Sequence, residues 1–158
     1  TPGNTNTLTT GTAVVRMRSN KVYKVTAQAS ALSVSSPGST DNGDDVSLSD
    51  IGFGITTMTL TGGNVANSGS RTDAITAGYD VSGGWPAASN GLTPAFTKTL
   101  NDISGSTQVL AGNRISKKGN MATNDNFISV TFGVATLPQL FTPNAGFSSI
   151  ITLTIASQ

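Results

Sequence analysis

The sequence predicts an all-β protein, folded as an antiparallel β-sandwich of about eight to ten short strands. Short segments in which apolar and polar residues alternate recur along the chain, separated by clusters of Gly, Asn, Ser and Pro. Helix-favouring residues are scarce, since all eight acidic residues are Asp and none is Glu. No repeat of roughly 20–50 residues and no break in composition divides the 158 residues, so we expect one domain.

The first two predicted strands lie at residues 13–18 and 22–31. Both alternate apolar and polar residues, and Ser19-Asn20-Lys21 between them has the composition of a turn, so we expect a β-hairpin. The apolar face of its second strand comprises Tyr23, Val25, Ala27 and Ala29. The alternation also predicts one solvated face that carries the nearby basic residues Arg16, Arg18, Lys21 and Lys24.

A loop at residues 35–45 is dense in Ser, Pro, Gly, Asn and Asp. Strand-like residues resume at 46–48 and at 51–60. In the second of these segments the apolar positions change parity after Ile55, so the pattern predicts a β-bulge near Thr56-Thr57.

Further strands are predicted in the second half of the chain, at residues 72–81, 95–100, 108–115, 126–135 and 148–156. The last of them is the most regular. Its side chains Ile151, Leu153 and Ile155 point to one side, and Thr152 and Thr154 point to the other. We therefore expect a terminal strand with one buried face.

Charged residues make up only 11% of the chain, and the net charge is +1, which argues against a nucleic-acid partner. The chain has no Cys, which excludes disulfides. It also has no run of about 18 apolar residues, so we expect no membrane insertion. It begins Thr1-Pro2-Gly3 without Met, as a mature terminus would after removal of a leader, or as an arbitrary boundary would. A polar, nearly uncharged surface is typical of extracellular proteins that pack against copies of themselves. We expect a secreted protein of the cell surface whose partners are its own copies.

The absence of His and Cys removes the commonest general base, the usual nucleophile–base pairs and the structural zinc ligand sets. Two carboxylates could act together in glycoside hydrolysis only if they converged across a cleft, and the Asp residues here fall mainly in turns. We therefore predict no catalytic residues and expect that the protein is not an enzyme.

One loop carries a cluster of oxygen ligands, Asp41, Asp44 and Asp45, which suits calcium in ligand type but lacks the spacing and closing Glu of the twelve-residue calcium loop. A solvated charged turn and a calcium site both stay open, and no other cofactor is expected. The single tryptophan, Trp85, is expected to cover one end of the sandwich. Its alternatives are stacking on a sugar ring and a contact between subunits.

Two segments resemble secreted pilin-type domains. Residues 141–149 (FTPNAGFSS), followed by the terminal strand, resemble the close of such domains. The opening of spore-coat-U-like and chaperone–usher pilins is similar to residues 15–20 (VRMRSN), which lead to Tyr23-Lys24-Val25-Thr26. The cysteine pair usual in that family is absent. The resemblance implies an immunoglobulin-like sandwich with an open groove, which the N-terminal arm of the next subunit fills as a donor strand.

Residues 1–11 are the candidate arm, and residues 12–158 are the single sandwich domain. A frayed terminus and an ordinary first strand of the same subunit are the alternatives for the arm. The residues expected to bind the partner come from both ends of the chain: Thr5, Leu8, Thr10, Thr12, Val14, Ile151, Leu153 and Ile155.

These expectations together predict a structural subunit of an extracellular, pilus-like or surface filament that polymerises by donor-strand exchange. Two other classes of protein remain as alternatives. One is a monomeric adhesin or carbohydrate-binding sandwich module that binds a glycan or a host surface. The other is a viral or phage jelly-roll coat protein.

Overall fold

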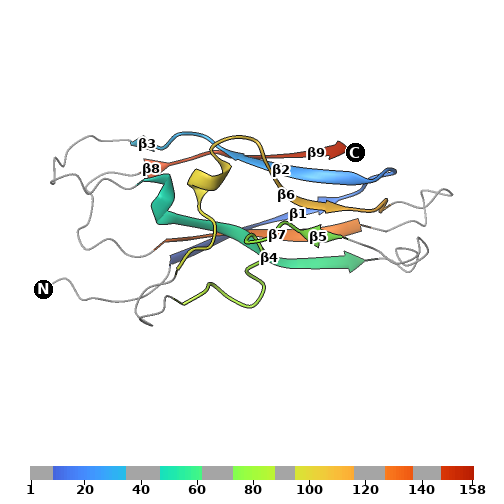
Figure 1. Ribbon diagram of the computed structural model, residues 1–158, viewed down its shortest axis with the longest axis horizontal. Coiled ribbons are helices and arrows are strands. Elements are labelled where there is room, and N and C mark those ends of the chain that lie inside the picture. Colours follow the sequence, from blue (N-terminus) through green and yellow to red (C-terminus); the bar gives the residue numbers. More distant parts are fainter. Residues whose placement is uncertain (1–8, 35–46, 62–72, 88–94, 116–126, 137–146) are drawn as a thin grey trace, which may run out of the picture.

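The protein is an all-β sandwich, as predicted, and its antiparallel strands form two main open sheets (Figure 1). The computed structural model describes residues 9–34, 47–61, 73–87, 95–115, 127–136 and 147–158. Nine strands lie in these ranges: β1 (Thr9–Met17), β2 (Tyr23–Ala29), β3 (Ser33–Val34), β4 (Ile51–Thr61), β5 (Ala74–Ile75), β6 (Thr107–Gly112), β7 (Phe127–Thr136), β8 (Phe147–Ser148) and β9 (Ile151–Ser157). Two short 3-10 helices accompany them: η1 (Leu48–Asp50) and η3 (Leu100–Ile103).

Sheet A has the strand order β1-β7-β4, and sheet B has the order β5-β6-β2-β9. A small third sheet pairs β3 with β8. The core lies between sheets A and B, and its largest fully buried side chains are Tyr23, Phe53, Ile55, Ile103, Leu110, Ile115, Ile128, Val25, Val109 and Val130. Burial of these side chains is the main stabilising term of the fold, because no disulfide is available.

The predicted hairpin between the first two strands is wrong, because β1 pairs with β7 whereas β2 pairs with β6 and β9. The connection crosses from sheet A to sheet B, and the backbone carbonyl of Ser19 accepts a hydrogen bond from the N–H of Ile115 at 2.9 Å. Alternation cannot separate the two cases, since facing strands of two sheets also bury alternate residues. Consequently Arg16 and Lys24 lie on opposite outer faces rather than on one.

The predicted bulge in β4 is confirmed. Pairing with β7 skips one residue between Ile55 and Thr57, which leaves Thr56 as the extra residue. The extra residue restores the inward direction of the apolar side chains, so that Ile55 is fully buried and Met58 still packs against the core. The apolar face of β2 is also confirmed, since its four predicted side chains are all buried.

Three predicted strands are shorter or different in the structure. Leu48 belongs to η1, where Ser47 and Asp50 form a capping box, and residue 46 lies outside the described ranges. The segment 95–100 makes only an isolated bridge, between Thr99 and Gly52, before η3 begins. In the segment 72–81 only β5 and an isolated bridge to β4 are regular.

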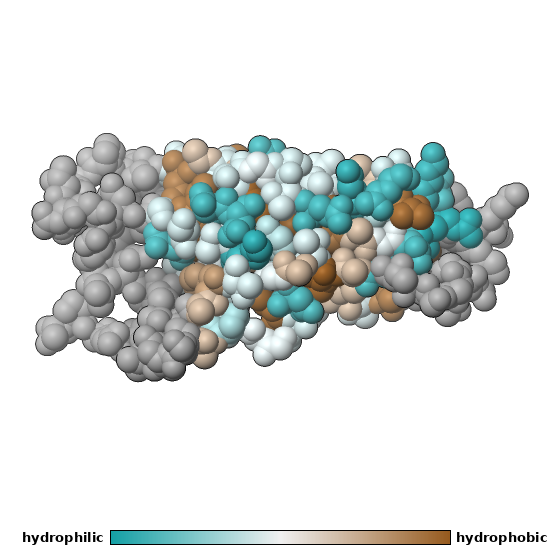
Figure 2. Space-filling model, in the orientation of Figure 1, coloured by the Kyte–Doolittle hydropathy of each residue, from teal (hydrophilic) through white to brown (hydrophobic). Residues whose placement is uncertain are grey.

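The terminal segment is divided into β8 and β9 by Ser149 and Ile150. Here the Ser149 hydroxyl donates to the Ser30 carbonyl at 2.9 Å, and the N–H of Ile150 donates to the Ser30 hydroxyl at 2.9 Å. These side-chain bonds replace part of the regular ladder between β2 and β9. On the face shown in Figure 2, the described surface is mostly polar or neutral in colour, with apolar patches between.

Candidate functional site

The two sides of the sandwich differ in how their edge strands are covered. On one side, β4 is the edge strand of sheet A, and its outer edge is hydrogen-bonded by backbone groups of later segments. The N–H of Phe53 donates to the Lys98 carbonyl at 2.9 Å, and the N–H of Ile55 donates to the Tyr79 carbonyl at 2.7 Å. The Ile55 carbonyl in turn accepts from the N–H of Val81 at 3.0 Å. This edge of sheet A is therefore protected against further pairing.

Aromatic side chains cover the outer face of sheet A beside this edge. Trp85 and Phe96 meet edge to face, with ring centroids 5.8 Å apart. Gly52 makes room for Phe96, since a Cβ there would overlap its ring. A Cβ at Gly133 would lie 3.4 Å from Trp85, an ordinary contact distance, so the Trp85 ring lies over the same face of the sheet. The expectation that Trp85 covers an end of the sandwich is therefore wrong, since its half-buried ring packs on the outer sheet face.

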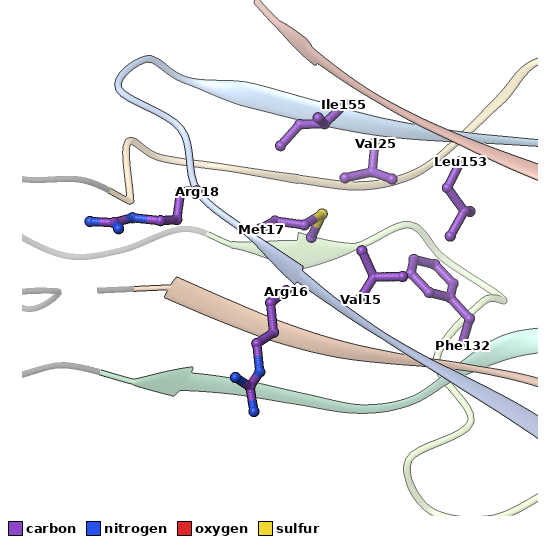
Figure 3. Close-up of a pocket in the computed structure, with 8 residues that line it drawn as sticks. All are labelled: Val15, Arg16, Met17, Arg18, Val25, Phe132, Leu153 and Ile155. Atoms are coloured by element: carbon purple, nitrogen blue, oxygen red, sulfur yellow. The ribbon is translucent and has the colours of Figure 1, made fainter. Parts of the chain in front are cut away.

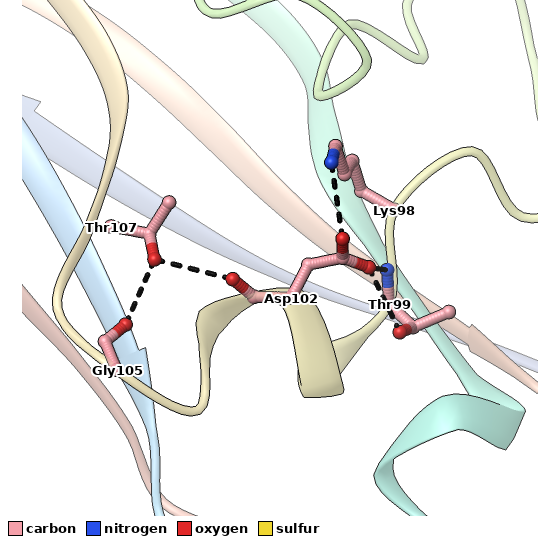
Figure 4. A network of polar contacts seen from close by, with 5 residues as sticks. All are labelled: Lys98, Thr99, Asp102, Gly105 and Thr107. Carbon is pink, nitrogen blue, oxygen red and sulfur yellow. Dashed lines mark hydrogen bonds and ion pairs between the residues drawn. The ribbon is translucent and has the colours of Figure 1, made fainter.

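A polar cluster holds the segment that precedes η3 (Figure 4). The Asp102 carboxylate accepts hydrogen bonds from the Thr99 N–H at 2.9 Å and from Lys98 Nζ at 3.0 Å. The hydrogen bond from the Thr99 backbone is the main reason why the pKa of Asp102 is below its ordinary value. The hydrogen bond to Asp102 raises the pKa of Lys98, and burial raises the pKa of the neighbouring Tyr79. Each charged group has a partner within the chain, so the cluster has a structural role.

Among the described residues, the other side of the sandwich is open along an apolar groove between β1 and β9. One part of the groove, a cavity of about 270 Å³, is lined mainly by Val15, Met17, Val25, Phe132, Leu153 and Ile155 (Figure 3). These side chains come from both sheets, and those of β1 face those of β9 across the opening. Arg16 and Arg18 also border it, but Figure 3 shows the guanidinium of Arg16 directed away from the apolar side chains.

A second cavity, of about 390 Å³, is lined by residues of β1, β7 and β9 together with residues of β4, β8 and η3. Its apolar lining includes Leu32, Ile51, Leu100, Val134 and Ile151. Together the two cavities follow the inner side of β9, and the apolar side of that strand is incompletely covered. Ile155 is 44% exposed, and Leu153 and Ile151 are half-buried. The expectation of a buried face on the terminal strand is thus met only in part.

The hydrogen bonds between β2 and β9 determine which backbone groups of β9 point to its open edge. Ser30 donates to Ile150 and Gln158 donates to Val22, which makes these two pairs hydrogen-bonded pairs of the β2–β9 ladder. Hydrogen-bonded pairs alternate along an antiparallel ladder. The N–H and C=O groups of the odd-numbered residues therefore point away from β2: Ile151, Leu153, Ile155 and Ser157. Within the described residues β9 pairs with β2 alone.

The same argument applies to β1. Phe53 and Ile55 bond away from β7, so Gly52 and Gly54 bond toward it, opposite Ala135 and Gly133. The neighbouring β7 residues Val134 and Phe132 therefore bond to β1, opposite Gly11 and Ala13. The backbone groups that face the open edge of β1 are therefore those of Thr10, Thr12, Val14 and Arg16. In the described part of the chain β1 has only β7 as its neighbour.

The structure brings six of the eight predicted partner-binding residues to these two edges on one side of the sandwich. Thr10, Thr12 and Val14 lie in β1, with their side chains on the exposed outer face, and Ile151, Leu153 and Ile155 lie in β9. The remaining two, Thr5 and Leu8, lie outside the described residues, as do Asp41, Asp44 and Asp45 of the predicted calcium loop.

Sequence reasoning missed the groove residues Val15, Val25 and Phe132. The alternation of polar and apolar residues in β1 indicates that Val15 points inward. It does not show that Val15 borders an open groove.

The described ranges contain no helix long and apolar enough to cross a membrane. They also hold no group of three or more acidic residues placed to bind a metal ion.

Comparison of the chain with protein-family models, with curated proteins and with solved structures finds no match. The site is therefore interpreted from its own geometry.

Proposed function

We propose that this protein is a structural subunit of an extracellular, pilus-like filament whose copies join by strand addition on the open side of the sandwich. The observation that carries the proposal is the apolar groove between two edge strands that are nearly free of charge. β9 has no charged residue, Pro or Gly, and β1 has Arg16 as its single charge. Edge strands of monomeric proteins are usually short, charged, bulged or covered, because a bare edge invites pairing with another chain.

The contrast with β4 supports this proposal. At Phe53 and Ile55, later segments of the same chain hydrogen-bond to the edge of β4. That edge is therefore covered, whereas the edges of β1 and β9 are not covered by the described residues. An added strand at the open side would gain two things: main-chain hydrogen bonds along the edge, and pockets for alternate side chains in the groove. Burial of the exposed part of Ile155 would add to this gain.

The proposed donor is the N-terminal arm, residues 1–11, of a neighbouring copy. Added next to β1, it would extend sheet A over the groove and cover Leu153 and Ile155. Its β-branched threonines suit an extended strand, and Leu8 is its one large apolar side chain. Because Thr9–Gly11 already pair with β7 within the described chain, the part of the arm available to another copy is residues 1–8.

The test compares full-length protein with a chain that lacks residues 1–8, a deletion that leaves β1 complete. We expect the full-length protein to form filaments in electron micrographs and the truncated protein to remain as small species in size-exclusion chromatography. Truncated protein that assembles as well as full-length protein would show that the arm is not the connector.

A point substitution with a matched control separates the role of the side chain from that of charge. Leu8→Asp should reduce assembly strongly, whereas Thr7→Asp, which places the same charge on the other side of an extended strand, should reduce it less. A synthetic peptide of residues 1–8 should raise the melting temperature of the truncated subunit, and the same peptide with Leu8→Asp should not. Equal effects of the two peptides would contradict insertion of Leu8 into the groove.

A further inference from the structure

The open edge of β9 is self-complementary. Residues 151–155 read Ile-Thr-Leu-Thr-Ile, the same in both directions. If two such strands run antiparallel about a two-fold axis beside Leu153, then Leu153 faces Leu153, Ile151 faces Ile155, and Thr152 faces Thr154 of the other copy. An isologous interface requires this kind of match, since the same surface must fit itself.

The direction of the backbone groups agrees with this register. The residues of β9 whose N–H and C=O groups point to the open edge are the odd-numbered ones, as derived from the β2–β9 ladder. In the two-fold register Leu153 meets its own copy, and Ile151 meets Ile155, so each such contact joins two outward-facing residues. The two strands can therefore exchange hydrogen bonds at Leu153 and at both Ile151–Ile155 contacts. A register shifted by one residue would place an outward-facing residue opposite an inward-facing one.

The side chains also fit on both faces. On the groove side the contacts join only apolar residues, and Ile155, which is 44% exposed in the single chain, would gain cover from Ile151 of the other copy. On the outer side, exposed Thr152 and Thr154 would form Thr–Thr pairs, which are favourable across strands. No charged side chain of β9 opposes the contact, because residues 151–158 contain none.

We infer that β9 pairs antiparallel with β9 of a second copy of this chain, so that two copies of sheet B form one continuous sheet with a two-fold axis beside Leu153. This deepens the proposed function, on which it rests for the idea that copies associate through strand edges. It uses a different edge from the donor arm, which is proposed to add to β1. One contact is thus two-fold and closed, and the other is head-to-tail and can repeat.

The register can be tested with single cysteines, because the chain has none of its own. The Cα atoms of directly opposite residues lie about 4.5–5.5 Å apart, within the range of a disulfide. Thr152 lies opposite Thr154 of the other copy but about 8 Å from its own equivalent, beyond that range. Both threonines are exposed on the outer face, so neither substitution disturbs the core.

We expect a mixture of the Thr152→Cys and Thr154→Cys variants to form a disulfide-linked dimer under mild oxidation, and each variant alone to form none above background. No dimer in the mixture, or equal amounts in all three samples, would overturn the inference. The outcome is independent of the donor arm when the experiment is repeated without residues 1–8. A cross-link that survives this deletion while filaments are lost supports both proposals, whereas filaments without the cross-link overturn the β9 pairing alone.

Discussion

Replacing Gly52 by alanine tests how the outer face of sheet A is closed. Gly52 is buried in β4, and an added Cβ would lie 2.8 Å from both Cγ and Cε1 of the Phe96 ring. Distances of this kind require the ring to move. The Phe96 ring also packs edge to face against Trp85, so its movement would disturb that contact.

The expected loss in the free energy of unfolding follows from two opposing terms. Overpacking of a well-packed site costs about 1–3 kcal/mol. Replacing Gly by Ala also restricts the unfolded chain, which returns about 0.4–1 kcal/mol. We therefore expect Gly52→Ala to destabilise the protein by about 1–2 kcal/mol.

Gly83 provides the matched control, because an added Cβ there would meet no atom within 4 Å and its φ is not positive. Gly83→Ala should leave the stability unchanged or raise it by up to about 1 kcal/mol. Urea denaturation followed by tryptophan fluorescence gives both values. Combining Gly52→Ala with Phe96→Ala should cost less than the sum of the two single changes, because the first clash disappears. Equal stability of the Gly52→Ala and Gly83→Ala variants, or additive effects of the pair, would refute the described contact.

Three further changes test other parts of the fold by urea denaturation. Asp102→Ala removes the acceptor of the Thr99 N–H and should cost about 0.5–1 kcal/mol at pH 7, with little of this from the exposed ion pair. Because the folded pKa of Asp102 is lowered, the carboxylate stabilises the fold above the ordinary Asp pKa, and this contribution should vanish as the pH falls through the lowered value; an undiminished difference in strong acid would argue against it. Tyr23→Phe removes a 3.1 Å hydrogen bond to Asp73 and should cost about 1 kcal/mol, so a neutral result would mean that water replaces the bond at no cost. Leu110→Ala empties a fully buried position and should cost about 2–5 kcal/mol, whereas a loss below 1 kcal/mol would place Leu110 outside the core.

Local patterns predicted the elements of this fold better than their pairing. The change of apolar parity after Ile55 located the bulge in β4, because a strand that buries one face needs an extra residue to restore its phase. The same kind of pattern misled at residues 19–21. A short polar connection can close a hairpin or carry the chain between facing sheets, and the choice depends on distant partners, here β7 and β9.

The candidate site shows the same division. The period of two identified Ile151, Leu153 and Ile155 as one face of a strand. It could not show that this face borders an open groove, because that depends on Val15 and Phe132 from segments far away in the sequence. The prediction of a strand at residues 95–100 was wrong for another reason. This segment is held by single backbone contacts to β4 and by η3, and it forms no continuous ladder with another strand.

The order of strands within the sheets has a consequence for how the chain acquires its structure. Met17 in β1 has its pairing partner at Ile128, and Ala29 in β2 has one at Ile151. The entropy lost on closing loops of that length is not offset until the strands pair, so we expect folding to be slow. During synthesis β2 lacks a pairing strand until residues 107–112 have been made, and β1 lacks one until residues 127–136 have been made. A mechanism that keeps growing chains apart would therefore matter more for this protein than for one built from hairpins.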